Sequence, residues 1–160
     1  ESSIGLIYTH RSTEDDILLG NPIQDRKTWG TDLNLSTSEF LGDNTLQFSA
    51  FFVAHNATLP SDDSTSISDR SVRGFRFNFP NQPWSAWVSY REFGDEYDPA
   101  IGFNQRNGFK RLQPAINYAP LFEKSQFIRE IEWGVYYEYL TSLETKPLCT
   151  ESAEVFFTRD

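Results

Sequence analysis

Apolar and polar residues alternate along most of this chain, which is the period of two expected of a β-strand. The pattern is clear from Trp84 onward, where Trp84 and Val88 share one parity and Ser85 and Ser89 the other. Gly, Pro, Asn and Asp residues, which favour turns, separate the alternating segments. The pattern predicts eight strands, over residues 2–11, 25–38, 45–56, 72–79, 84–93, 109–118, 126–141 and 151–159.

The seventh predicted strand, 126–141, shows the clearest alternation of all and is the longest of the eight. Sixteen residues exceed the five or six that are typical of globular strands. Its Arg129 interrupts an otherwise apolar face near one end, where a long side chain can reach polar surroundings. Its opposite face carries Glu130, Glu132 and Glu138.

The predicted connections differ in length in a regular way. Short turns near Gly42, Pro80 and Lys124 alternate with longer polar loops over 12–24, 57–71 and 94–108. Short turns at one end and long loops at the other are typical of outer-membrane barrels. The sequence therefore predicts an all-β fold, an antiparallel up-and-down transmembrane β-barrel or part of one, with about eight strands.

In such a barrel, aromatic residues gather near both ends of the outward face, and polar residues face inward. The outward girdle is predicted to contain Trp29, Trp84, Tyr118, Trp133, Tyr137 and Tyr139. The lumen-facing polar positions are predicted to include Asp32, Arg76, Glu130, Glu132 and Glu138.

A soluble antiparallel sandwich or barrel is the alternative, because its core would need the same apolar face. The alternation alone favours neither fold, whereas strand length and loop asymmetry favour the membrane barrel. In a soluble module, Trp84, Trp87 and Tyr90 could form a stacking platform for a sugar ligand. Contact with a core or with lipid explains the same aromatic residues more simply.

Composition narrows the possible functions further. The 160 residues form about one domain, taken as a single β-barrel segment over 1–160, and the net charge of −9 disfavours nucleic-acid binding. The single cysteine, Cys149, can form neither an internal disulfide nor a Cys₄ zinc site, and no cofactor is expected. The chain has no Met and no signal peptide, which suggests a processed product or a piece of a longer chain.

Two groups of carboxylates are candidate chemical sites. Asp95, Glu96 and Asp98 could bind a hard cation, but their spacing matches no EF-hand, so a solvated acidic loop is favoured and no metal is expected. The glutamates of the seventh strand could act as a glycosidase pair, yet alternate acids are also typical of a wet strand face. His10 and His55 stand alone, and no nucleophile or phosphate-loop motif appears, so no enzymatic activity is expected.

Three short segments resemble the C-terminal barrel region of the DUF5916 family. They are SSIGLIYTHR at 2–11, WGTDLN at 29–34, and an aspartate followed by Gly-Phe-x-x-Arg, which here is Asp98, Gly102, Phe103 and Arg106. Members of the family that these segments resemble are outer-membrane proteins of Bacteroidota and similar Gram-negative bacteria. They usually begin with a family-9-like carbohydrate-binding sandwich, which is missing here, so the resemblance implies an interior part of a barrel.

Within that third segment, a loop-fixing role is predicted. Together with Asp98, Gly102 gives backbone freedom, Phe103 acts as a plug, and Arg106 clamps acids or carbonyl oxygens. No catalytic residue can be transferred from the family.

These observations together predict a non-enzymatic outer-membrane β-barrel protein of a Gram-negative bacterium, acting in transport, surface binding or envelope assembly. Its expected partners are the lipid bilayer, further barrel strands or other envelope proteins, and a glycan, with no nucleic acid. The first and eighth strands are expected to pair with another segment, because open edges are not tolerated in lipid. A soluble carbohydrate-binding module is the second hypothesis, and a glycan-active enzyme is the third.

Overall fold

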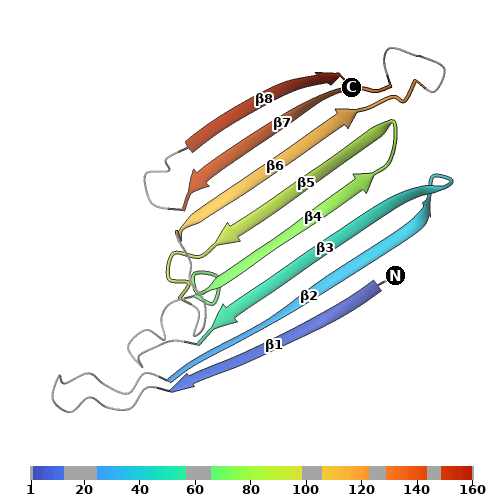
Figure 1. The fold of residues 1–160 in the computed structure, drawn as a ribbon. Helices are drawn as coiled ribbons and strands as arrows, with labels where there is room; N and C mark the ends of the chain where they lie inside the picture. The colour runs from blue at the N-terminus through green and yellow to red at the C-terminus, as the bar shows by residue number, and fades with distance from the viewer. Residues whose placement is uncertain are drawn as a thin grey trace.

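The computed structural model describes residues 2–12, 25–56, 66–98, 106–122, 129–143 and 149–159. Eight strands form one antiparallel sheet in chain order, each paired with the next (Figure 1). The all-β, up-and-down antiparallel prediction is therefore confirmed. The strands are β1 (Ser2–Ser12), β2 (Asp25–Phe40), β3 (Asn44–His55), β4 (Ser71–Pro80), β5 (Trp84–Phe93), β6 (Phe109–Tyr118), β7 (Ile131–Ser142) and β8 (Cys149–Arg159).

Strand bounds agree with the predicted ranges to within two residues except at β7. This strand has 12 residues and starts at Ile131, and Arg129 precedes it. The predicted start at 126 falls in 123–128, which lie outside the described residues. A bridge between Leu121 and Glu130 stands apart from the strand. The longest strand is β2, with 16 residues.

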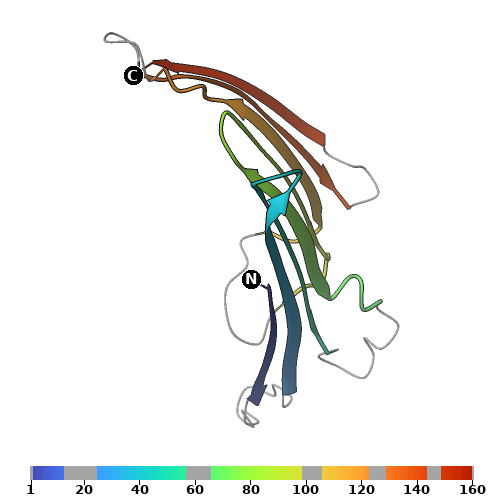
Figure 2. The same cartoon turned by 90° about the vertical axis from the view of Figure 1, so that its right-hand side faces the viewer.

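The sheet is a single curved layer that does not close on itself. Figure 2 shows the layer from the side, with β1 and β8 at its two edges. These two strands do not pair with each other in the described part of the chain. The chain exposes 11318 Å² at a mass of 18.5 kDa, whereas a compact protein of that mass exposes roughly 8,200 Å². The excess is expected of a sheet with no second layer on it.

The two ends of the sheet differ in their connections (Figure 1). One end, called the loop end, holds the connections 13–24, 56–70, 94–108 and 143–148. The other, the turn end, holds the tight turns 41–43 and 81–83 and the connection 119–130. Gly42 has a φ of 103° in the first turn, a conformation that favours glycine. The connection 119–130 is longer than the short turn predicted near Lys124.

Strand register divides the side chains into two faces. The apolar face holds the even-numbered residues of β1, β3, β5 and β6 and the odd-numbered residues of β2 (up to the register shift after Thr37), β4, β7 and β8. The polar face holds the others. On the apolar face, Leu6, Phe77, Trp133 and Phe157 are all exposed. Away from the loop end, nothing within the described residues covers this face.

The only buried hydrophobic side chains among the described residues are Ala54 and Val72. Both lie in the loop-end half of the sheet, where residues 66–70 and 94–98 pack together. The amide of Gly94 donates to the carbonyl oxygen of Ser71 at 2.9 Å, and a Cβ on Gly94 would collide with the backbone of Asp69. Among the described residues, buried hydrophobic side chains therefore occur at the loop end, and the rest of the sheet is a single layer with two accessible faces.

Candidate ligand-binding face

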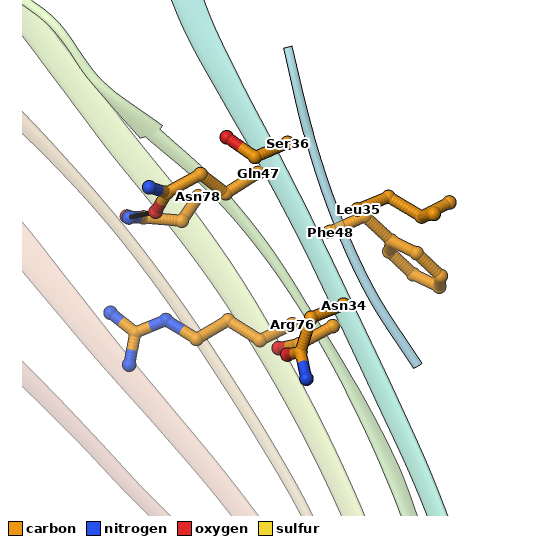
Figure 3. Close-up of a pocket in the computed structure, with 8 residues that line it drawn as sticks. Asn34, Leu35, Ser36, Gln47, Phe48, Arg76 and Asn78 are labelled. Atoms are coloured by element: carbon orange, nitrogen blue, oxygen red, sulfur yellow. Dashed lines mark hydrogen bonds between the residues drawn. The ribbon is translucent and has the colours of Figure 1, made fainter. Parts of the chain in front are cut away.

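A hollow on the polar face crosses β2, β3 and β4. Its volume is about 290 Å³. Figure 3 shows that the polar lining side chains point to one side of the sheet, whereas Leu35 and Phe48 point to the other. We call this hollow the amide pocket, defined by Asn34, Ser36, Gln47, Ser49, Arg76 and Asn78.

Hydrogen bonds between strands orient the amides of this pocket. The Nδ2 of Asn78 donates to the Oε1 of Gln47 at 2.8 Å (Figure 3). The Nδ2 of Asn34 donates to the Oδ2 of Asp32 at 3.0 Å. Each amide keeps further donor or acceptor capacity after these bonds, because a carboxamide offers two donors and one carbonyl oxygen. Such groups can hydrogen-bond the hydroxyls of a polar ligand.

An aromatic surface continues from the pocket onto β5 and β7. The guanidinium carbon of Arg76 lies 4.5 Å from the ring centroid of Trp87, a cation–π contact. The Trp87 ring in turn lies 5.9 Å from that of Tyr136, across the small Ala115 of β6. The Trp87 indole therefore has Arg76 on one side and Tyr136 on the other, and all three side chains lie on the polar face.

Glu138 on β7 belongs to a local hydrogen-bond group. The Nε2 of Gln113 donates to both the Tyr136 hydroxyl and the Glu138 carboxylate. The Tyr136 hydroxyl also donates to the Oε2 of Glu138 at 3.1 Å. This carboxylate is thus occupied by an amide and a phenol rather than paired closely with a second carboxylate.

A separate polar cluster lies at the loop end of the apolar face. Glu92, which is 9% exposed, accepts from Arg73 Nη2 at 2.7 Å and from the Tyr90 hydroxyl at 2.7 Å, and lies 3.8 Å from Lys110 Nζ. Arg73 also donates through Nε to the same carboxylate. These contacts satisfy the charges where an otherwise apolar face ends.

The connection after β5 is fastened by His55, a residue that is 5% exposed. Its Nδ1 lies 2.7 Å from the carbonyl oxygen of Asn56, and its Nε2 lies 2.9 Å from the carbonyl oxygen of Glu96 and 3.0 Å from the amide nitrogen of Asp98. The Asp98 carboxylate pairs with Arg26, and Tyr97 packs against the His55 ring, where burial raises the pKa of its phenol.

The structure separates the three aromatic residues predicted to bind sugar. Trp84 and Tyr90 lie on the apolar face, and Trp87 lies on the polar face, so they do not form one platform. Trp84 packs against Tyr118 at 4.5 Å between centroids, and Tyr90 stacks on Phe75 at 5.7 Å. Of the three, only Trp87 borders the amide pocket.

The predicted lumen-facing positions share one face where register defines it. Asp32, Arg76, Glu132 and Glu138 all lie on the polar face. Glu130 lies just before β7, in the bridge to Leu121.

Half of the predicted loop-fixing set can be located. Asp98 has the contacts with His55 and Arg26 described above, and the Arg106 guanidinium lies 5.9 Å from the Phe109 ring centroid. Gly102 and Phe103 lie outside the described residues. Within the described ranges, no group of His, Cys, Asp or Glu side chains could hold a metal ion.

Sequence reasoning missed two features of this surface. His55 was read as a lone histidine, because its partners are backbone groups that carry no side-chain signal. The cross-strand pair of Arg91 and Arg111 was also missed, although their positions follow once β5 and β6 are aligned. Strand register was the signal that could have found the pair.

Comparison with protein-family models, with curated proteins and with solved structures found no match. The resemblance to DUF5916 therefore stays a prediction. No helix long and apolar enough to cross a bilayer occurs among the described residues.

Proposed function

We propose that this chain is a non-enzymatic, membrane-spanning segment of an outer-membrane β-barrel of a Gram-negative bacterium. The observation that carries the proposal is the uncovered apolar face of a single-layer, up-and-down sheet. Monomeric soluble proteins rarely leave apolar patches larger than a few hundred Å² exposed. A lipid bilayer would cover such a face without any further protein layer.

Strand length supports the proposal. The strands are 10 to 16 residues long, and a tilted strand needs about 9–11 residues to cross the hydrocarbon core. Each strand alternates between the two faces, as a lipid-facing and a water-facing side require.

The distribution of aromatic residues also supports it. At the turn end of the apolar face, Trp84, Tyr118 and Trp133 form one cluster, with centroids 4.5–5.9 Å apart. At the loop end, Tyr8 pairs in register with Trp29. Tryptophan and tyrosine are favoured at both membrane–water interfaces, because one end of each side chain is apolar and the other polar.

The middle of the apolar face suits acyl chains. A hollow of about 420 Å³ lies there, lined mainly by Phe48, Ala50, Phe75, Phe77 and Tyr90. The small Ala50 lies directly opposite Phe75, so the aromatic side chains stand above it. A flexible hydrocarbon chain can fill such an uneven apolar surface.

The edges indicate what would complete the barrel. β1 and β8 each have one unpaired edge in the described part of the chain. Since unpaired backbone groups are not tolerated in lipid, further strands or another envelope protein would pair these edges. Transport, surface binding and envelope assembly are the roles open to such a barrel.

A soluble carbohydrate-binding module is the second candidate, and the amide pocket beside Trp87 favours it. In that case another protein layer would cover the apolar face.

Detergent phase partitioning separates the two candidates. The purified chain is mixed with a nonionic detergent that separates from water on warming, and both phases are assayed. We expect the chain in the detergent phase, and aggregated when detergent is withdrawn. A monodisperse monomer that stays in the aqueous phase would contradict the membrane proposal and favour the soluble module.

A further inference from the structure

Three arginines of the polar face lie on neighbouring strands. Arg91 of β5 is directly opposite Arg111 of β6, and Arg76 of β4 is opposite Ser89, one diagonal step from Arg91. Like charges placed directly opposite one another destabilise a sheet. The fold nevertheless gathers three positive charges here, in a chain whose net charge is −9.

No described carboxylate forms an ion pair with any of these three arginines. The ion pairs found between two described residues join Arg26 to Asp98, and Arg73 and Lys110 to Glu92. Glu138, the acid on the neighbouring strand, is held by Gln113 and Tyr136. The Nε of Arg111 is buried and has no hydrogen-bond partner.

Arg76 connects this arginine cluster with the amide pocket. Its guanidinium lies over Trp87, on the diagonal opposite to Arg91, so it is turned away from the other positive charges. It also lines the pocket beside Gln47 and Asn78 (Figure 3). One continuous surface thus offers arginine forks, which match carboxylate and phosphate groups, next to amides that suit hydroxyls.

We propose that the polar face binds an acidic sugar. Its acid group lies against Arg91 and Arg111, where a negative charge relieves the repulsion between these two arginines. The sugar extends from this pair toward Arg76 and the amides of Asn34, Gln47 and Asn78. A uronic acid and a sugar phosphate share this chemistry. The site goes beyond the proposed membrane role and depends only on the polar face.

Titration of the full chain in detergent micelles tests the site. The probes are galacturonate, glucose 6-phosphate, inorganic phosphate and neutral glucose, followed by calorimetry and by tryptophan fluorescence. We expect saturable binding of at least one acidic sugar, at least tenfold weaker binding of inorganic phosphate, and none of glucose. The fluorescence change should disappear in Trp87→Phe, because Trp87 is the tryptophan beneath Arg76.

Variants separate a binding role from a structural one. Arg91→Gln and Arg111→Gln are expected to weaken acidic-sugar binding at least tenfold, and each should raise the urea midpoint of the ligand-free protein by relieving repulsion. Arg129→Gln, an exposed position before β7, removes the same charge away from the cluster and should change binding less than twofold. Circular dichroism checks that each variant is folded.

Several results would overturn the inference. They are no saturable binding of either acidic sugar, equal binding of glucose or of inorganic phosphate, or an equal loss of binding in Arg129→Gln. Binding of galacturonate would identify a carboxylate ligand, and binding of glucose 6-phosphate would identify a phosphate ligand. Partitioning measured on the same samples keeps the two proposals apart, because binding by an aqueous-phase monomer would support this site while contradicting the membrane role.

Discussion

Along β5, neighbouring residues meet opposite surroundings. Trp84 and Val88 belong to the apolar face, where aromatic rings pack on one another, as in the 4.6 Å contact between Phe48 and Phe77. Trp87 belongs to the polar face, where arginine and tyrosine hold its ring. Apart from the Arg91–Arg111 pair, these polar-face side chains have partners within the chain, whereas the apolar face needs a partner from outside it.

The largest expected effect comes from placing a charge on the apolar face. Phe77→Lys should destabilise the chain in lipid vesicles by about 2–4 kcal/mol, the cost of a lysine near the middle of a bilayer. Asn78→Lys is the matched control, because it adds the same charge one residue away on the polar face.

Urea unfolding followed by tryptophan fluorescence measures both variants. Asn78→Lys should cost less than about 1 kcal/mol, since a half-buried polar group is replaced and one hydrogen bond is lost. Equal destabilisation by the two lysines would contradict the assignment of opposite surroundings to the two faces.

A smaller effect is expected at the charged boundary of the apolar face. Glu92→Gln should destabilise the chain by about 1.5–3 kcal/mol, because Arg73 and Lys110 would lose the carboxylate that pairs with them. Tyr90→Phe removes one hydrogen bond to the same carboxylate and should cost less. The same unfolding experiment ranks them, and a silent Glu92→Gln would mean that this cluster does not stabilise the loop end.

A local effect is expected where the connection after β5 is fastened. His55→Phe keeps a ring beside Tyr97 but removes the contacts with Asn56, Glu96 and Asp98, at a cost of about 1–2 kcal/mol. Hydrogen exchange should show faster exchange of the Asp98 amide with little change in β5 and β6. Uniformly faster exchange across the sheet would show instead that His55 supports the whole fold.

The smallest effect is expected inside the amide pocket. Gln47→Ala removes an exposed acceptor from Asn78 and should cost about 0.5 kcal/mol in the free energy of unfolding. Acidic-sugar binding, measured by calorimetry, should weaken more visibly than stability. A large loss of stability would show that the pocket is a structural element of the sheet.

Much of the fold follows from local alternation. Side-chain parity on Trp84, Val88 and Ser85 sets both the strand and its two faces, because β-strands have a period of exactly two. The predicted strand begins before β7, because residues 129 and 130 have only local pairing: Glu130 bridges to Leu121, and the Phe122 amide donates to the carbonyl oxygen of Arg129 at 2.9 Å. Strand ends depend on pairing, which a single strand's pattern does not contain.

The candidate site was less predictable, because it depends on register between strands. Trp84, Trp87 and Tyr90 are close in sequence, and only their parity separates them onto opposite faces. Arg91 and Arg111 are 20 residues apart in number yet opposite in the sheet. This pairing is set by the alignment of β5 with β6. The residues that connect the two strands carry no periodic signal that would predict the alignment.

The measurement that tests the central claim most directly is tryptophan quenching by brominated lipids. Three of the four tryptophans, Trp29, Trp84 and Trp133, lie on the apolar face, and Trp87 lies on the polar face. Variants that keep one tryptophan, with the others changed to phenylalanine, are reconstituted into vesicles with brominated acyl chains. The account predicts strong quenching of Trp84 and Trp133 by lipid, and quenching of Trp87 by aqueous iodide alone. Apolar-face tryptophans that brominated lipid leaves unquenched would contradict it.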